Sequence, residues 1–268
     1  MDLLEYRAVC LFLGKQLRVS LRSAVAQRGA FIIELLFMAL NNLIFFTFWW
    51  ALFQKVPNVR GYQLQDVALL FGIVAVSYGL HVVFAGGASE LGRLIVDGEL
   101  DVYLMHPKPT LLAVLGSRSR ASGLGDAVSG LLLILAFGRV PLSHLGLLLP
   151  AVLVSALILT ATVTCFWSIA FYLGEARALV RLAFEILLNF SLYPKGLFGG
   201  LIKGLMFTAV PAAYIGHMPT ELVRSPSLSS AAILVAVAIA YSVGACCLFR
   251  HGLQRYSSGS RFTLHGER

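Results

Sequence analysis

The sequence predicts an all-α integral membrane protein, and three observations support this fold class. Of the 268 residues, 58% are hydrophobic and only 13% are charged. The mean hydropathy of +0.83 is typical of a chain built for lipid rather than of a soluble domain. Several uncharged stretches also reach the roughly 20 residues that a helix needs to cross a bilayer. The net charge of +8 therefore indicates basic residues that orient membrane helices, not a nucleic-acid-binding surface.

Six transmembrane helices are expected, four from uncharged runs and two that tolerate one acidic residue each. In chain order they cover residues 35–54, 67–89, 121–138, 146–174, 182–201 and 226–249. The third contains Asp126 and the fifth contains Glu185. Because Tyr193-Pro194 interrupts the fifth run, it should end near that proline, and short non-spanning outer helices are expected over 194–225.

The distribution of basic residues predicts that both termini lie in the cytoplasm. One side of the membrane collects 15 of the 21 Lys and Arg residues and the other collects 6. Basic residues favour cytoplasmic loops, so the chain is expected to be N-in and C-in, as one transmembrane domain over 1–268. Residues 1–29 have interspersed acids and bases, which disfavours a secretory signal. They favour an interfacial helix, and the alternative is an extension of the first span.

The longest cytoplasmic loop, residues 89–109, contains three carboxylates in five residues, Asp97, Glu99 and Asp101. Drawn as one helix, 90–105 has two apolar faces with acidic residues along its flanks. One face is formed by Leu91, Leu94, Ile95, Gly98, Val102 and Met105, and the other by Val96, Leu100, Tyr103 and Leu104. A helix resting on anionic lipid favours one apolar face and basic flanks instead. The pattern favours docking between the membrane bundle and a cytosolic partner; the alternative is an amphipathic connector, and Gly98 allows a break.

Three segments together carry a family resemblance. The stretch IVDGELDVYLMHPKP contains a G-x-L-D-x-x-L-x-x-P pattern, LYPKGLFGG begins with a Tyr-Pro break, and FRHGLQRYSSGS contains G-L-x-R-Y-x-S. In this order, the segments resemble the ABC type-2 exporter permeases, the membrane subunits of ATP-binding-cassette exporters. Ala212-Ala213 departs from that pattern, because an aromatic residue is expected there.

The resemblance implies a multi-pass subunit of an ATP-driven exporter in the bacterial cytoplasmic membrane. It implies a dimer with a second copy or a homologous permease, two soluble ABC ATPase subunits, and ATP and Mg²⁺ bound by those subunits. The cytoplasmic segment would then be a coupling helix between spans two and three. The residues expected to couple to the ATPase are Leu91, Ile95, Asp97, Glu99, Leu100, Asp101, Tyr103, Leu104 and Pro107. The resemblance also places an outer gate at Tyr193, Pro194, Pro211 and Pro219.

Three further residues have open roles. Trp49 and Trp50 belong to an aromatic cluster that is explained by an interfacial belt or by contact with a lipophilic substrate in a dimer groove. Asp126 could line the pathway, contact a second subunit, or lie at the membrane interface.

Two other function classes are alternatives to the exporter subunit: a membrane enzyme and an ATP-independent transporter or channel. The only Gly-Lys pair is Gly14-Lys15, without the glycine and Ser/Thr spacing of a P-loop, so no nucleotide site and no cofactor are expected on this chain. The sequence also lacks H-E-x-x-H and metal-ligand cysteine spacing, which disfavours a lipid-modifying enzyme. A secondary transporter or channel is the main alternative, although no repeat between the halves supports it.

Overall fold

The computed structural model describes residues 14, 15, 18, 22, 28–105 and 109–257, and within them it is all-helical, with one isolated β-bridge between Val59 and Tyr62. Six longer helices lie where the six spans are expected. They are α2 (Arg28–Lys55), α3 (Leu64–Ala85), α7 (Gly123–Phe137), α8 (Leu145–Ser168), α10 (Arg177–Leu192) and α13 (Leu228–Arg255). The interfacial helix expected over 1–29 lies outside the described residues, apart from the first turn of α2 and four isolated positions.

Four helical stretches are long and apolar enough to cross a membrane. These are Phe31–Lys55, Leu64–Val96, Leu142–Leu173 and Leu228–Arg255. In contrast, α7 has 15 residues and α10 has 16, which gives each a length of roughly 22–24 Å against a hydrocarbon core of about 30 Å. The structure therefore supports an integral membrane protein with four candidate spans, and the six-span topology stays a prediction.

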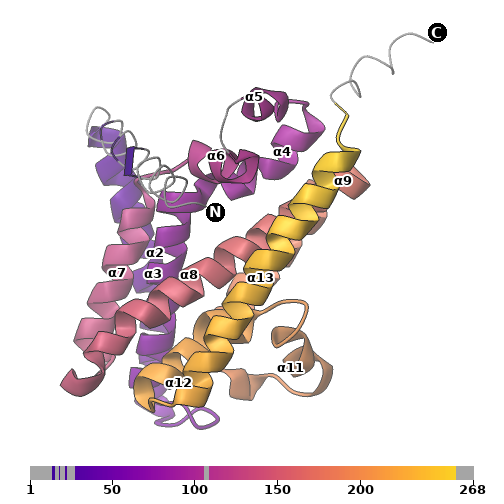
Figure 1. Ribbon diagram of the computed structural model, residues 1–268. Coiled ribbons are helices and arrows are strands. Elements are labelled where there is room, and N and C mark those ends of the chain that lie inside the picture. The colour runs from indigo at the N-terminus through magenta and orange to yellow at the C-terminus, as the bar shows by residue number, and fades with distance from the viewer. Residues whose placement is uncertain (1–13, 16–17, 19–21, 23–27, 106–108, 258–268) are drawn as a thin grey trace.

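Close glycine contacts fix the centre of the bundle, where α3 packs against α7. A Cβ atom on Gly79 would lie 2.4 Å from the carbonyl oxygen of Gly123, and one on Gly72 would lie 2.8 Å from that of Gly130. Only glycine permits such an approach of two backbones, as in other membrane helix pairs. Around this pair α2 lies against α7, and α8 crosses α3 and packs along α13 (Figure 1).

The outer surfaces of α2 and α13 are apolar and exposed. In their most apolar windows only 11% and 22% of residues are buried, compared with 72% for α3. Exposed side chains include Ile33, Phe37 and Ile44 on α2 and Ile239 on α13. A soluble protein would not expose such a surface, so these faces are suited to lipid or to another apolar protein.

Short helices gather at the two ends of the bundle (Figure 1). At one end lie α4 (Leu91–Val96), α5 (Asp101–Leu104), α6 (Thr110–Ser117), α9 (Ala170–Leu173) and the C-terminal end of α13. At the other lie α11 (Gly200–Met206), α12 (Met218–Arg224) and the 56–63 loop. The first end holds segments that the basic-residue count assigns to the cytoplasm, so it is called the coupling end below; the second is called the opposite end.

Residues 194–225 form short helices rather than a span. They are η3 (Lys195–Leu197), α11, the π-helical turn η4 (Ala213–His217) and α12. Ala212 and Ala213, where an aromatic residue was expected, are both fully buried. The same turn is closely packed, because a Cβ on Gly216 would lie 2.3 Å from the carbonyl oxygen of Ser191. Small side chains at 212 and 213 suit this packing.

Candidate functional site

The candidate site is the segment 91–105 at the coupling end, and its backbone is not the single helix expected from the sequence. Helix α4 stops at Val96, Gly98 adopts a φ of 74°, and α5 begins at Asp101. The Leu100 amide donates to the Leu94 carbonyl at 3.1 Å, which closes the turn. The break that the sequence allowed at Gly98 is therefore present, because glycine at 98 adopts the left-handed conformation that other residues avoid.

The turn divides the expected faces into an inner layer and an outer layer. Leu91, Leu94, Ile95 and Leu100 are buried and form the inner layer. Val102, Leu104 and Met105 are 52%, 42% and 78% exposed, and they are called the outer tip here. The helical period predicts Leu91 and Val102 on one face and Leu100 on the other. In the structure Leu91 and Leu100 are buried together and Val102 is exposed, because the turn at Gly98 changes the direction of the chain.

The inner layer packs on the ends of the membrane helices. Its cluster includes Val114 of α6, Ala170 of α9 and Phe249 of α13, with Trp167 and Phe171 packed against it. The contact with Trp167 is close, since a Cβ on Gly92 would lie 2.4 Å from its ring. Tyr103 is partly buried against the same cluster. The inner layer is therefore in direct contact with the ends of α8, α9 and α13.

The carboxylates of the segment are held by two arginines. The Arg93 guanidinium lies 3.0 Å from Glu90, 3.6 Å from Asp97 and 2.8 Å from Glu99. Arg177, at the start of α10, lies 3.6 Å from the other oxygen of Asp97. These side chains are partly exposed, so each pair is worth about 0–1 kcal/mol. The network orients the turn rather than presenting three free acids to a partner, although half of the Glu99 side chain remains exposed.

Asp101 connects α5 to the end of α13. The Tyr256 phenol, just after α13, lies beside Asp101, and its pKa is raised to about 12 by burial first and by that carboxylate second. In the sequence, Tyr256 belongs to the closing G-L-x-R-Y-x-S motif and Arg177 is one of the basic residues on the cytoplasmic side, and no local pattern pairs either with the segment. The i,i+4 spacing of Arg93 and Asp97 was the available local signal for the charge network. Pro107 lies outside the described residues.

The residues that precede and follow the segment 91–105 contact each other at the C-terminal end of α3. The turn η1 (Gly86–Glu90) leads from α3 into α4, and it passes against α6. A Cβ on Gly87 would lie 1.8 Å from the carbonyl oxygen of Val114, and one on Gly86 would lie 2.5 Å from that of Arg118. Residues before and after the candidate site are thus in direct backbone contact.

The residues expected in an outer gate lie at the opposite end. Tyr193 packs edge-on against Trp49, with ring centres 5.8 Å apart. Pro194, Pro211 and Pro219 are buried. The structure therefore places these residues in tightly packed positions, and a gating role stays a prediction.

A neutral hydrogen-bonded pair that the sequence did not reveal lies beside them. His217 Nε2 donates to the Phe190 carbonyl at 3.3 Å, so its Nδ1 accepts from the Tyr62 hydroxyl at 3.4 Å. Burial lowers the pKa of His217 to about 4 and raises that of Tyr62 to about 12. The two residues are 155 positions apart, so no local pattern could have paired them.

Ion pairs close the opposite end around this hydrogen bond. Arg224 pairs with Asp66 at 3.0 Å and donates to the Gly138 carbonyl at 2.8 Å. Lys195 pairs with Glu221. These contacts join α3, α7, η3 and α12 at one place.

Of the three residues proposed for the pathway or a dimer contact, only Trp50 lies at the surface, with 45% exposure. Trp49 is 2% exposed and packs on Phe53 and Tyr193. Asp126 is 6% exposed and accepts a hydrogen bond from Asn42 Nδ2 at 3.0 Å. Trp49 and Asp126 thus pack within this chain, and their functional roles remain predictions.

Comparison with known proteins gives one match. A family described as ABC-2 family transporter protein matches residues 36–260. No curated protein and no solved structure matches the chain.

Proposed function

Because the chain belongs to the ABC-2 transporter family, we propose that it is the transmembrane subunit of an ATP-driven exporter in the bacterial cytoplasmic membrane. It would form half of a dimeric pathway together with a second copy or a homologous permease. Two separate ABC ATPase subunits would bind and hydrolyse ATP with Mg²⁺, since the sequence of this chain contains no P-loop.

The two-layered segment 91–105 is the observation that carries this proposal. Its inner layer is packed on the ends of α8, α9 and α13, while the outer tip presents three large apolar side chains. Exposed apolar groups beside an acidic network favour a protein partner over an anionic lipid surface. A partner that moves the outer tip would therefore act through the inner layer on two candidate spans, Leu142–Leu173 and Leu228–Arg255.

The surface of α10 supports the dimeric part of the proposal. Arg177, Arg181, Glu185 and Asn189 recur every four residues, and the last three are exposed. An ionised side chain at the bilayer centre costs at least about 2.5 kcal/mol, so this face is unsuited to lipid. The exposed face of α13, with Ile233, Ile239 and Val243, is suited to lipid by contrast. The α10 face is therefore our candidate for the surface between two permeases and along the pathway.

The test is purification of the tagged full-length chain from its native membranes in mild detergent. Retention of a P-loop ATPase, identified by mass spectrometry, and ATP hydrolysis by the complex are expected. The double variant Leu104→Asp with Met105→Asp should release the ATPase, because it places charge on the outer tip. Leu142→Asp is the matched control, since Leu142 is 88% exposed on η2 (Leu142–His144), which contacts Val223 of α12 at the opposite end through His144.

Two results would contradict the proposal. One is a chain that never retains an ATPase while transporting solute along an ion gradient, which would favour a secondary transporter. The other is full retention of the ATPase by the outer-tip variant, which would show that the outer tip is not the contact with the ATPase.

A further inference from the structure

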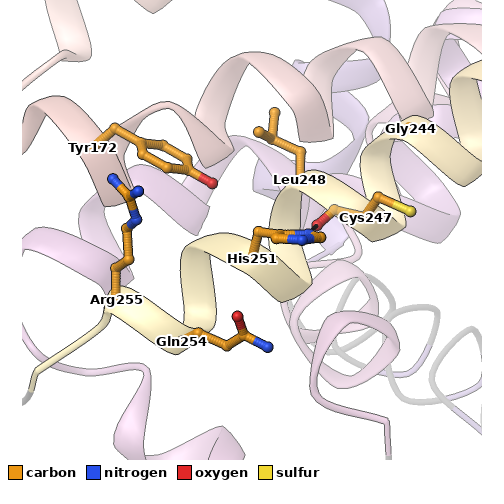
Figure 2. A pocket seen from close by; sticks show the side chains of 7 residues that line it. All are labelled: Tyr172, Gly244, Cys247, Leu248, His251, Gln254 and Arg255. Atoms are coloured by element: carbon orange, nitrogen blue, oxygen red, sulfur yellow. Dashed lines mark hydrogen bonds between the residues drawn. The ribbon is translucent and has the colours of Figure 1, made fainter.

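A groove of about 500 Å³ lies beside the C-terminal turns of α13, apart from the segment 91–105 (Figure 2). It is lined by Tyr172 of α9 and by Gly244, Cys247, Leu248, His251, Gln254 and Arg255 of α13. The α13 residues recur at intervals of three and four, so they share one face of the helix.

The groove changes in chemical character along its length. Gly244, Cys247 and Leu248 at one end carry no charge, whereas His251, Gln254 and Arg255 at the other carry hydrogen-bonding groups. From Gly244 to Arg255 the helix rises by about 16 Å. Since α13 is a candidate span that ends at Arg255, the polar end lies at the edge of the apolar helix. An amphiphile whose polar end points out of the membrane fits this gradient.

Local packing places the Arg255 guanidinium in the groove. A Cβ on Gly252 would lie 2.3 Å from the Phe171 ring, so glycine at 252 allows α9 to approach α13. The neighbouring Tyr172 ring then lies under the Arg255 guanidinium, whose central carbon is 5.1 Å from the ring centre. Figure 2 shows this stacking. Stacking on a ring face orients the guanidinium and leaves its N–H groups available at the edge.

Arg255 gives the lining of the groove a positive charge. No carboxylate is among its lining residues in the described part of the chain. Arginine binds phosphate oxygens with two parallel hydrogen bonds, and basic pockets between membrane helices are known sites for anionic lipid head groups. The groove therefore matches a ligand that has a phosphodiester at one end and uncharged acyl chains at the other.

We propose that the groove binds an anionic phospholipid, with Arg255 contacting the phosphodiester and His251 and Gln254 hydrogen-bonding to the head group. The acyl end lies along Gly244 and Leu248. This inference depends on the chain spanning a membrane and does not depend on an ATPase partner.

The test measures lipid binding to the purified full-length chain in detergent by native mass spectrometry, with phosphatidylglycerol and phosphatidylcholine as probes. Arg255→Gln should weaken phosphatidylglycerol binding about five-fold, the factor for one interfacial arginine. Phosphatidylcholine has the same phosphodiester but no net charge, so it should bind more weakly to the unchanged chain and lose less affinity in this variant. Arg250→Gln is the matched control, because Arg250 is an exposed residue of α13 that does not line the groove. It should leave the binding of both lipids unchanged.

A second variant tests occupancy of the groove independently of charge. No atom lies within 4 Å of a Cβ placed on Gly244, so Gly244→Leu fills the apolar end without a clash. It should reduce the binding of phosphatidylglycerol while the melting temperature stays unchanged.

Three results would overturn the lipid site. Equal effects of the two arginine variants would indicate general attraction of anionic lipid, and full binding by Gly244→Leu would place the lipid elsewhere. Displacement of phosphatidylglycerol by millimolar inorganic phosphate would identify a free phosphate as the ligand. The assay contains no ATPase, so failure of the proposed exporter function would not affect its outcome.

Discussion

The two ends of the bundle hold broken helices by different physical means. At the coupling end, Gly98 interrupts a helix and partly exposed ion pairs around Arg93 orient the turn. At the opposite end, prolines interrupt the chain, and a neutral hydrogen bond between half-buried Tyr62 and buried His217 joins the pieces in addition to two ion pairs. Exposed ion pairs are weak and sensitive to salt, whereas buried neutral hydrogen bonds are costly to leave unmade. The orientation of the Gly98 turn should thus be more sensitive to salt than the hydrogen bond between Tyr62 and His217.

The largest expected effect separates the two layers of the coupling end. Leu100→Ala should lower the free energy of unfolding by about 2–5 kcal/mol, because Leu100 is fully buried. Leu104→Ala should have little effect on stability, since Leu104 is 42% exposed. Thermal unfolding of both variants in detergent checks this difference. Equal melting temperatures would show that the layers are not distinct.

The next effect concerns pH at the opposite end. Because burial lowers the pKa of His217 to about 4, the unfolded chain takes up the proton first as pH falls. Stability should therefore be complete above about pH 6.5 and fall by up to about 1.4 kcal/mol per unit between pH 6.5 and 4. Melting temperatures across this range provide the measurement. His217→Gln should flatten the profile, and an unchanged profile in that variant would assign the titration to another group.

A smaller effect is expected from the turn at the coupling end. Gly98→Ala should cost about 1–2 kcal/mol, because Gly98 has a φ of 74° that alanine avoids. Gly204→Ala is the control, since Gly204 lies within α11 with open space around its Cβ position. Denaturation of both variants compares them. A loss in the control as large as that in Gly98→Ala would argue against backbone strain.

The smallest effect is expected from the charge network. Arg93→Gln should reduce stability by no more than about 1 kcal/mol, and the reduction should shrink as salt is raised from 50 to 500 mM. Melting curves at both salt concentrations test this. If salt makes no difference, the exposed pairs do not set the stability of the coupling end.

The positions of the long helices could be predicted from the sequence because lipid imposes a simple length rule. The hydrophobic runs locate α2, α3, α8 and α13, and the proline after Tyr193 marks the end of α10. The family could also be recognised from three ordered segments, and the family match over residues 36–260 confirms it.

The arrangement at each end could not be predicted in the same way. A helical wheel assumes a continuous helix, so it placed Leu100 opposite Leu91, whereas the turn at Gly98 buries both. Glycine lowers helix propensity by only about 1 kcal/mol, and packing of Leu100 decides the outcome. The pair of Tyr62 and His217 arises from long-range folding, which local patterns do not encode.

The contact of Gly86 and Gly87 with the backbone of Arg118 and Val114 has a mechanical consequence. The chain leaves the C-terminal end of α3 at Gly86 and returns to nearly the same point at Val114 and Arg118. The segment between these contacts is therefore anchored at one place, which can act as a pivot. A push on Met105 then acts as a torque about that pivot. A partner that pushed there would therefore tend to turn the segment about this contact rather than to slide it along the membrane helices.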